Sequence, residues 1–264
     1  MRKPFRFLLG LAALGVLAFA TLNLVDYLLE SNQSKNLNES LIGKAVAVND
    51  PDPQSSDVDF SAERESEANT EQLPMEIAPI EVDFEALWET NEDVIGWIYC
   101  EDTPINFPVV QAEDNDCYLR RLIDGTLNSS GTLFVDYRNA DDFSDSNTII
   151  YGHNMKNKGM FGTLPNYKEQ SYYDEHPLMW LLTPDGNYKV ELIAGYVTSS
   201  TSEIYSFGQT EEEVLALAEQ SIEKSTFTSD FQASKGDRFV TLSTCSYEYD
   251  NARYVLIGRL LPLD

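Results

Sequence analysis

The sequence predicts a mainly β fold, either a closed barrel or a sandwich, with a few helices packed outside it. The first observation behind this prediction is a series of short apolar and β-branched segments that are separated by turn-forming residues. The second is that only a few stretches have the spacing of a helix. The predicted strands cover residues 93–99, 105–111, 131–136, 147–152, 188–197, 239–244 and 254–257.

Turn residues mark where these strands end. Asp102-Thr-Pro104 separates the first two strands, and Pro184-Asp-Gly-Asn187 precedes the strand at 188–197. The polar segment Ser246–Ala252 joins the last two strands. Because that connection is short, we expect these two strands to pair as antiparallel neighbours.

Three stretches are predicted to be helical. Asp83 can cap a short helix whose apolar residues fall on one face. The segment Tyr118–Ile123 has a helical pattern that ends at an Asp-Gly pair. Thr210 and Glu213 form a capping box that starts a longer helix reaching about Lys224. We expect these helices to pack outside the sheet.

Composition excludes several classes of function. The 264 residues include 44 Asp and Glu against 18 Lys and Arg, a net charge of −26, so a phosphate backbone would be repelled and nucleic acid is not an expected partner. Three cysteines are too few for a disulfide framework, and with two distant histidines they lack the spacing of zinc ligands. No acidic run has the spacing of a calcium loop. We therefore expect no metal and no cofactor.

The N-terminus carries a predicted membrane anchor at residues 1–30. Basic residues precede the apolar run Phe7–Val25 and acidic residues follow it, which predicts a cytoplasmic N-terminus and an extracellular remainder. About 20 helical residues span the roughly 30 Å hydrocarbon core. The alternative is a cleaved signal peptide with a small-x-small site at Ala18–Ala20. The apolar run continues past that site, and this favours a retained single-pass anchor.

The remainder divides into a linker and a folded domain. Residues 31–79 show no sustained period of 2 or 3.6 and are rich in Asp, Glu, Ser, Asn and Pro. Such a composition buries too little apolar surface to offset the entropy of ordering, so we predict an acidic, disordered linker. The folded domain is predicted to cover residues 80–264.

Candidate chemistry gathers at the last two predicted strands. Cys245 ends the first of them, and Arg253 begins the second, so the two side chains should lie roughly opposite each other. A nearby cation favours thiolate over thiol, which makes Cys245 a candidate nucleophile. His153 directly follows the 147–152 strand, although a surface histidine that caps a turn would look the same. His176 lies in a polar loop next to a proline and is predicted to be structural.

The other two cysteines are weaker candidates. Cys100 follows an apolar strand and is expected to pack as a small hydrophobic residue. Cys117 begins the predicted helix at 118–123, where a helix N-terminus can lower the pKa of a thiol. It has no obvious base or arginine beside it. A disulfide between Cys100 and Cys117 stays open at this point.

These residues resemble a known family. The run Thr241-Leu-Ser-Thr-Cys245 with Arg253, preceded by Thr148-Ile-Ile-Tyr-Gly-His153-Asn-Met, closely resembles the sortases, which are cysteine transpeptidases of Gram-positive surfaces. The resemblance covers about 82–260. Three further features resemble the class B branch, and they are the segment 93–98, the segment 154–162 and the helix predicted at 210–224.

The resemblance implies an eight-stranded sortase β-barrel with peripheral helices. It also implies that Cys245 is the nucleophile, that His153 is the general acid and base, and that Arg253 is the cation beside the oxyanion. The residue after the nucleophile, Ser246, is acidic in some relatives, which leaves its part in substrate contact open. The expected substrate-binding residues are Ser243, Thr244, Tyr205 and Ile204.

The implied reaction is anchoring of secreted proteins to the cell wall. The enzyme would cleave a C-terminal sorting motif of the Asn/Ser-Pro-x-Thr-Asn/Gly kind after Thr and pass the thioacyl group to a peptidoglycan amine, on lipid II or a cross-bridge. The alternatives are a pilus-type sortase with a lysine acceptor, a Cys–His peptide hydrolase, and a non-catalytic tethered binding domain. The expected partners are sorting-signal proteins, the wall precursor and the membrane.

Overall fold

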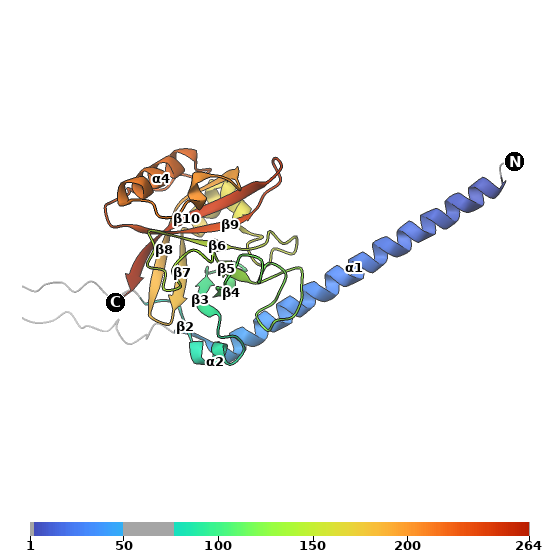
Figure 1. The fold of residues 1–264 in the computed structure, drawn as a ribbon, viewed down its shortest axis with the longest axis horizontal. Coiled ribbons are helices and arrows are strands. Elements are labelled where there is room, and N and C mark those ends of the chain that lie inside the picture. The colour runs from blue at the N-terminus through green and yellow to red at the C-terminus, as the bar shows by residue number, and fades with distance from the viewer. Residues whose placement is uncertain (1–2, 50–76, 264) are drawn as a thin grey trace, which may run out of the picture.

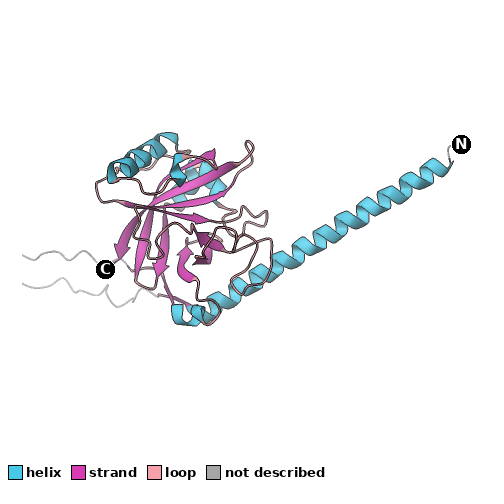
Figure 2. Ribbon diagram, viewed as in Figure 1, coloured by secondary structure: helices cyan, strands magenta, loops and turns pink. Residues whose placement is uncertain are grey.

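The computed structural model describes residues 3–49 and 77–263, and within them eight strands close into a barrel (Figures 1 and 2). The order around the barrel is β10-β8-β7-β3-β4-β5-β6-β9, with β9 and β10 also paired. This confirms the predicted barrel. The strands are β3 Val94–Tyr99, β4 Asn106–Val110, β5 Leu133–Val135, β6 Asn147–Tyr151, β7 Leu178–Thr183, β8 Gly186–Ser199, β9 Arg238–Cys245 and β10 Ala252–Leu263.

The barrel is mixed. Six of its neighbouring pairs are antiparallel, whereas β4 with β5 and β6 with β9 run parallel. A parallel pair cannot be joined by a tight hairpin, so its connection must cross over. The crossovers here are the loop between β4 and β5 and the long excursion from β6 through β7 and β8 to β9. The two parallel pairs therefore bring segments that are distant in sequence next to one another.

Strand β7 was not predicted from the sequence. Its residues form a continuous apolar run from Leu178 to Leu182, and the strand is buried on both faces except at the first position. Periodicity alone does not tell such a short apolar run from part of a buried helix, and β7 lacks the β-branched residues that marked the other buried strands until Thr183. The pairing of β7 with β3 and β8 supplies the evidence that the local pattern lacks.

The helices lie outside the barrel (Figure 2). Asp83 caps α2, and the predicted capping box between Thr210 and Glu213 begins α4, so both predictions are confirmed. The predicted helix at Tyr118–Ile123 is wrong. That segment forms turns, and a bridge between Arg121 and Leu127 folds it back on itself. The helical elements of the domain are α2 Phe84–Trp88, η2 Leu164–Lys168, α3 Gln170–Glu175, η3 Glu203–Tyr205 and α4 Glu211–Lys224.

Three apolar clusters form the core. The largest fills the barrel with side chains from strands all around it, including Ile98, Leu192 and Leu242. A second cluster lies on the outside of the barrel beneath α2, and a third lies beneath α4. The barrel is therefore packed on its inside and covered at two places on its outside.

The N-terminal helix α1 runs unbroken from Lys3 to Ala45, which corrects the prediction of a disordered linker for residues 31–49. Leu37, Leu41 and Ala45 recur every four residues and pack into the second cluster, so they form one apolar stripe against the barrel. Most other residues of the segment are polar, so its composition alone does not indicate this apolar stripe. Residues 50–76 of the predicted linker lie outside the described residues.

A short sheet completes the attachment of α1. Strand β1, Val46–Val48, follows the helix directly and pairs antiparallel with β2, Ile80–Val82. Farther toward the N-terminus, apolar side chains of α1 such as Leu17 and Leu22 are exposed. Among the described residues, α1 is long and apolar enough to cross a membrane, a test that a signal sequence also passes.

Candidate active site

The two faces of β9 have different surroundings. Val240 and Leu242 belong to the cluster inside the barrel, whereas Phe239 belongs to the outer cluster beneath α4. Because successive strand residues point to opposite faces, Ser243 and Cys245 share the outer face with Phe239. The nucleophile candidate is therefore on the outside of the barrel, and its side chain is partly exposed.

Cys245 lies between the two other predicted catalytic residues. Arg253 on β10 is its direct partner in the antiparallel register. On the other side, β6 runs parallel to β9, and Tyr151 pairs with Ser243. His153 and Cys245 each follow two residues after this pair, so they reach the same level of the sheet. Partners at one level of a sheet point to the same face. The strand order β6-β9-β10 thus places the chain at His153 and the start of β10 at Arg253 on either side of the end of β9.

Hydrogen bonds fasten the chain on both sides of His153 to the end of β9. The Gly152 carbonyl accepts a bond of 2.8 Å from Thr244 Oγ1. Asn154 Nδ2 donates a bond of 2.8 Å to the carbonyl of Cys245. The position of His153 relative to the thiol is therefore fixed by its own neighbours. Sequence reasoning missed Asn154, although it directly follows the histidine in the motif.

Gly152 is required by packing. A Cβ at this position would lie 2.4 Å from Leu133 Cδ2 and 2.6 Å from Phe161 Cδ2. Both contacts are far below van der Waals separation, so any side chain would push the turn away from the barrel. The glycine before His153 thus lets the chain turn close against the barrel.

The ring of His153 has a backbone partner. Its Nε2 lies 2.7 Å from the carbonyl oxygen of Leu119, in the crossover between β4 and β5. Because a carbonyl oxygen can only accept, Nε2 carries the proton of this bond. No sequence signal marks Leu119, since any residue can supply a carbonyl group.

Two donors beside Cys245 converge on one oxygen. Arg253 Nη1 and the backbone N–H of Ser246 each donate a 3.0 Å bond to the carbonyl of Ala252. The guanidinium and this amide are therefore close together next to the thiol. In this structure both are engaged with the hairpin that joins β9 to β10.

Tyr205 covers the face of β9 next to Cys245. Its hydroxyl shares a 2.7 Å hydrogen bond with Ser243 Oγ, and its ring stacks on Tyr151 with centroids 6.2 Å apart. Burial raises the pKa of Tyr205 to about 12, although the bond to Ser243 and the charge of Arg253 act in the opposite direction. Tyr205 therefore stays a neutral phenol that closes one side of the site.

The four predicted substrate-binding residues are placed unequally. Tyr205 and Ser243 lie on the site face, with Ser243 covered by the tyrosine. Ile204 is 2% exposed and packs into the cluster beneath α4. Thr244 is also 2% exposed and points to the opposite face of β9 from Cys245. The structure thus brings Tyr205 and Ser243 to the site and leaves Ile204 and Thr244 within the packing.

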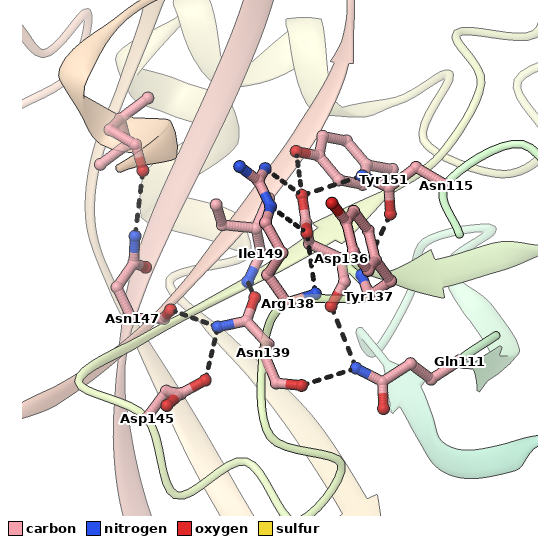
Figure 3. Close-up of polar contacts among 11 residues, drawn as sticks. Gln111, Asn115, Asp136, Tyr137, Arg138, Asn139, Asp145, Asn147, Ile149 and Tyr151 are labelled. Atoms are coloured by element: carbon pink, nitrogen blue, oxygen red, sulfur yellow. Dashed lines mark hydrogen bonds and ion pairs between the residues drawn. The ribbon is translucent and has the colours of Figure 1, made fainter. Parts of the chain in front are cut away.

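A buried carboxylate supports the neighbouring wall of the site (Figure 3). Asp136 has a fully buried side chain and accepts two 2.8 Å bonds from the guanidinium of Arg138. Asn115 Nδ2 and the hydroxyl of Tyr151 each donate a further 3.0 Å bond. Burial alone would raise the pKa of Asp136, but these bonds outweigh burial and lower it. The aspartate is therefore a charged anchor for Tyr151 and Arg138.

Known proteins share this arrangement. No family model matches the chain. Sortase B of Listeria monocytogenes is 38% identical over 183 residues, which are 66% of this chain and 72% of that protein. The chain belongs to the sortase B family. It is therefore a cysteine transpeptidase of the type that anchors surface proteins.

Solved sortase B structures share the fold. The Staphylococcus aureus sortase B–substrate complex aligns with a TM-score of 0.65 at 29% identity, over 69% of this chain and 85% of that one. A crystal structure of sortase B complexed with triglycine aligns with a TM-score of 0.64, also at 29% identity, over 69% and 86%. The eight-stranded sortase barrel that the resemblance implied is thus confirmed.

The remaining two cysteines of the chain are free. Cys100 is 1% exposed, and its Sγ lies 3.5 Å from the carbonyl oxygen of Leu178 and 3.8 Å from the hydroxyl of Tyr167. Burial raises the pKa of the Cys100 thiol. Cys117 is exposed, so the disulfide that the sequence left open does not form.

His176 packs at the end of a short helix. It caps the C-terminus of α3, and its ring packs on Tyr172 with centroids 4.7 Å apart. Its backbone carbonyl also accepts a 2.9 Å bond from the hydroxyl of Tyr167. Within residues 3–49 and 77–263, no group of three or more His, Cys, Asp or Glu side chains could hold a metal ion.

Proposed function

We propose that Cys245, His153 and Arg253 form the catalytic site of this transpeptidase, and that the chain acts as a single-pass membrane protein with an extracellular catalytic domain. The observation that supports the proposal is the register, in which Arg253 pairs directly with Cys245 while β6, the strand that leads to His153, pairs with β9 on the other side. The exposed apolar half of α1 supports a retained anchor.

Cys245 acts as the nucleophile. Its thiolate attacks the carbonyl carbon of the threonine in a sorting motif of the Asn/Ser-Pro-x-Thr-Asn/Gly kind. The C–N bond of the next residue then breaks, and a thioester remains on Sγ. This covalent route divides one difficult amide exchange into two easier steps. The partial exposure of Cys245 supports the role, because an extended peptide can reach it on the outer face of the barrel.

His153 moves the protons. As an imidazolium it protonates the departing amine, and as a neutral base it then accepts a proton from the incoming amine. The Leu119 carbonyl at Nε2 supports both forms, since that nitrogen carries a proton in the neutral tautomer and in the cation. The bonds of Gly152 and Asn154 to β9 hold the ring beside the thiol through the cycle.

Arg253 stabilises the developing oxyanion. Its guanidinium can exchange the bond to the Ala252 carbonyl for one to the tetrahedral intermediate, and the Ser246 amide can do the same. Tyr205 forms one wall of the surface that receives the motif next to the thiol, and Ser243 beneath it holds its hydroxyl. Thr244 and Ile204 support this surface from within.

The acceptor is proposed to be a glycine amine of the wall precursor. One solved relative is described as a complex with triglycine and another as a complex with substrate, which supports a sorting-signal donor and a glycine acceptor. The amine attacks the thioester, the Cys245 thiolate leaves, and a new amide forms. Water or a lysine side chain as acceptor would give a hydrolase or a pilus-type enzyme instead.

A donor library and two acceptors test the proposal. The full chain in detergent is incubated with peptides that vary around the proposed motif, with and without triglycine, and the products are identified by mass. We expect a thioacyl intermediate and a peptide–triglycine product that replaces hydrolysis when triglycine is present. The Cys245→Ala variant should give neither. Exclusive hydrolysis in the presence of triglycine, or products from that variant, would contradict the proposal.

A further inference from the structure

Helix α1 brings two loops of the domain close to the end of its apolar run. The run ends at Val25, and the helix continues without a break. The carbonyl of Glu30 accepts a 2.9 Å bond from Asn128, and Ser31 Oγ accepts a 2.7 Å bond from Asn157. At 1.5 Å per residue, these contacts lie about 9 Å or less along the helix from Val25. Figure 1 shows these loops beside the middle of α1.

The same two loops carry four exposed cations. Arg120 and Arg121 lie in the crossover that contains Asn128, and Lys156 and Lys158 flank Asn157. Among the described residues, none of these four forms an ion pair with a carboxylate. Cations elsewhere in the described chain are commonly paired, as Lys44 with Glu89, Lys168 with Glu248 and Arg259 with Glu191.

The local charge is opposite to that of the whole chain, which carries a net −26. The two loops, residues 118–130 and 154–162, contain four cations and one carboxylate, Asp124. Glu30 of α1 adds a second carboxylate, which accepts a hydrogen bond from the Ser129 hydroxyl, so cations outnumber carboxylates four to two. Leu127 adds an apolar side chain that is 73% exposed. A basic face with an exposed leucine has the chemistry of a surface that rests on an anionic bilayer.

We propose that these two loops form a lipid-binding face, defined by Arg120, Arg121, Leu127, Lys156 and Lys158, that binds the headgroups of anionic phospholipids. The inference rests on the proposed retention of the anchor. Lipid is the occupant because the continuous helix enters the bilayer within two turns of these loops. The face holds the catalytic domain against the membrane in one orientation, whereas a flexible tether would let it rotate freely.

The lipid-binding face adjoins the catalytic site along the chain. Arg120 follows Leu119, whose carbonyl bonds the ring of His153, and Lys156 lies three residues after His153. Contact with headgroups therefore orders the two segments that position the imidazole. A consequence is that the transpeptidase should be more active in anionic bilayers than in neutral ones.

Hydrogen exchange on the full chain in nanodiscs tests the proposal. Neutral discs of phosphatidylcholine are compared with discs that contain phosphatidylglycerol, and exchange is followed in residues 118–130 and 154–162. We expect exchange in these loops to slow by about fivefold or more in the anionic discs at low salt, and the difference to disappear near 1 M salt, where the Debye length is about 3 Å.

Matched variants identify the side chains responsible. Lys156→Glu with Lys158→Glu, and the neutral Lys156→Gln with Lys158→Gln, should abolish the difference between the two lipids. The control, Lys224→Glu with Lys235→Glu, changes the net charge equally at α4 and at the loop before β9 and should keep the difference. Equal exchange in both lipids, or loss of the difference in the control, would overturn the proposal.

The proposed function is read out separately on the same samples. Thioester capture in detergent reports on the transpeptidase, and the intact mass of the membrane-purified chain reports whether the anchor is retained. A protein that retains its anchor and captures peptide but shows no lipid-dependent protection contradicts the lipid-binding face alone. Protection that soluble glycerophosphate reproduces in neutral discs would also contradict it, because the loops would then bind a free phosphate.

Discussion

The ends of β3 and β9 each place a cysteine at the edge of the same barrel, and the two thiols have opposite surroundings. Cys100 is 1% exposed, contacts Tyr167, and has a raised pKa because it is buried. Cys245 is partly exposed and faces Arg253 across a hairpin. The residue type is the same, so the difference arises from the environment that the strand ends provide.

Strand parity decides between the two environments. Cys100 is two residues after Ile98 and shares its place in the cluster inside the barrel. Cys245 is three residues after Leu242, another interior residue, and so points outward. One residue of offset thus separates a thiol that packs inside the barrel from one that points outward. The following predictions test this contrast, beginning with the largest expected effect.

Removing each thiol should separate catalysis from packing. Cys245→Ala should lower the turnover of a sorting peptide by more than about 10⁴-fold, because the covalent step is lost. Cys100→Ala should leave turnover within about twofold while lowering the free energy of unfolding by about 1 kcal/mol, since it leaves a small cavity. Steady-state kinetics and urea unfolding measure the two effects. Comparable losses of turnover in both variants would show that the two thiols do not differ in their catalytic part.

Removing the cation should affect only the outer thiol. Arg253→Ala should lower kcat by about 10²–10³-fold, as expected when one oxyanion donor is lost. Arg259→Ala, at the other end of the same strand, breaks the ion pair with Glu191 and should leave kcat within about twofold. Single-turnover acylation kinetics measure both variants. An Arg253→Ala enzyme with normal acylation would show that the facing guanidinium has no catalytic part.

Alkylation should distinguish the two thiols directly. In the folded chain, iodoacetamide should modify Cys100 at least about tenfold more slowly than Cys245, because burial limits access and raises the pKa of the thiol. Raising the pH should increase the Cys100 rate only at higher pH than for an ordinary cysteine. Peptide mapping by mass gives the rates, and exposed Cys117 is the internal reference. Equal rates at Cys100 and Cys117 would show that burial does not protect it.

The weak ion pair between Lys168 and Glu248 should stabilise the loop that follows Cys245. Hydrogen bonds from Lys168 and then Ser246 lower the pKa of Glu248 to about 2. A lowered folded-state pKa means that the stabilisation is present above the ordinary pKa of about 4.5 and is lost as the pH falls toward 2.

Because the Lys168–Glu248 pair is partly exposed, Glu248→Gln should cost less than about 1 kcal/mol at pH 7. Thermal unfolding between pH 7 and pH 2.5 measures the difference from the parent, which should shrink as the pH falls. A difference that grows toward low pH would have the wrong sign for this ion pair.

Local patterns in the sequence determined much of the protein. Apolar and β-branched segments between turn residues located most of the strands, and the capping residues Asp83 and Thr210 located two helices. The spacing of Cys245 and Arg253 placed them opposite each other, as the register confirms. These features depend on neighbours that are close in the chain, so a single sequence is enough to show them. The motif around His153, together with that around Cys245, indicated the sortase family.

Only the tertiary structure decided the rest. The partner of His153 is a carbonyl at Leu119, the order of residues 31–45 comes from a stripe against the barrel, and β7 is recognised only by its pairing with β3 and β8. Each of these rests on contacts between segments far apart in sequence, through groups such as a backbone carbonyl that every residue has. A local pattern of side chains does not show such contacts, because they form only when the folded barrel brings the distant segments together.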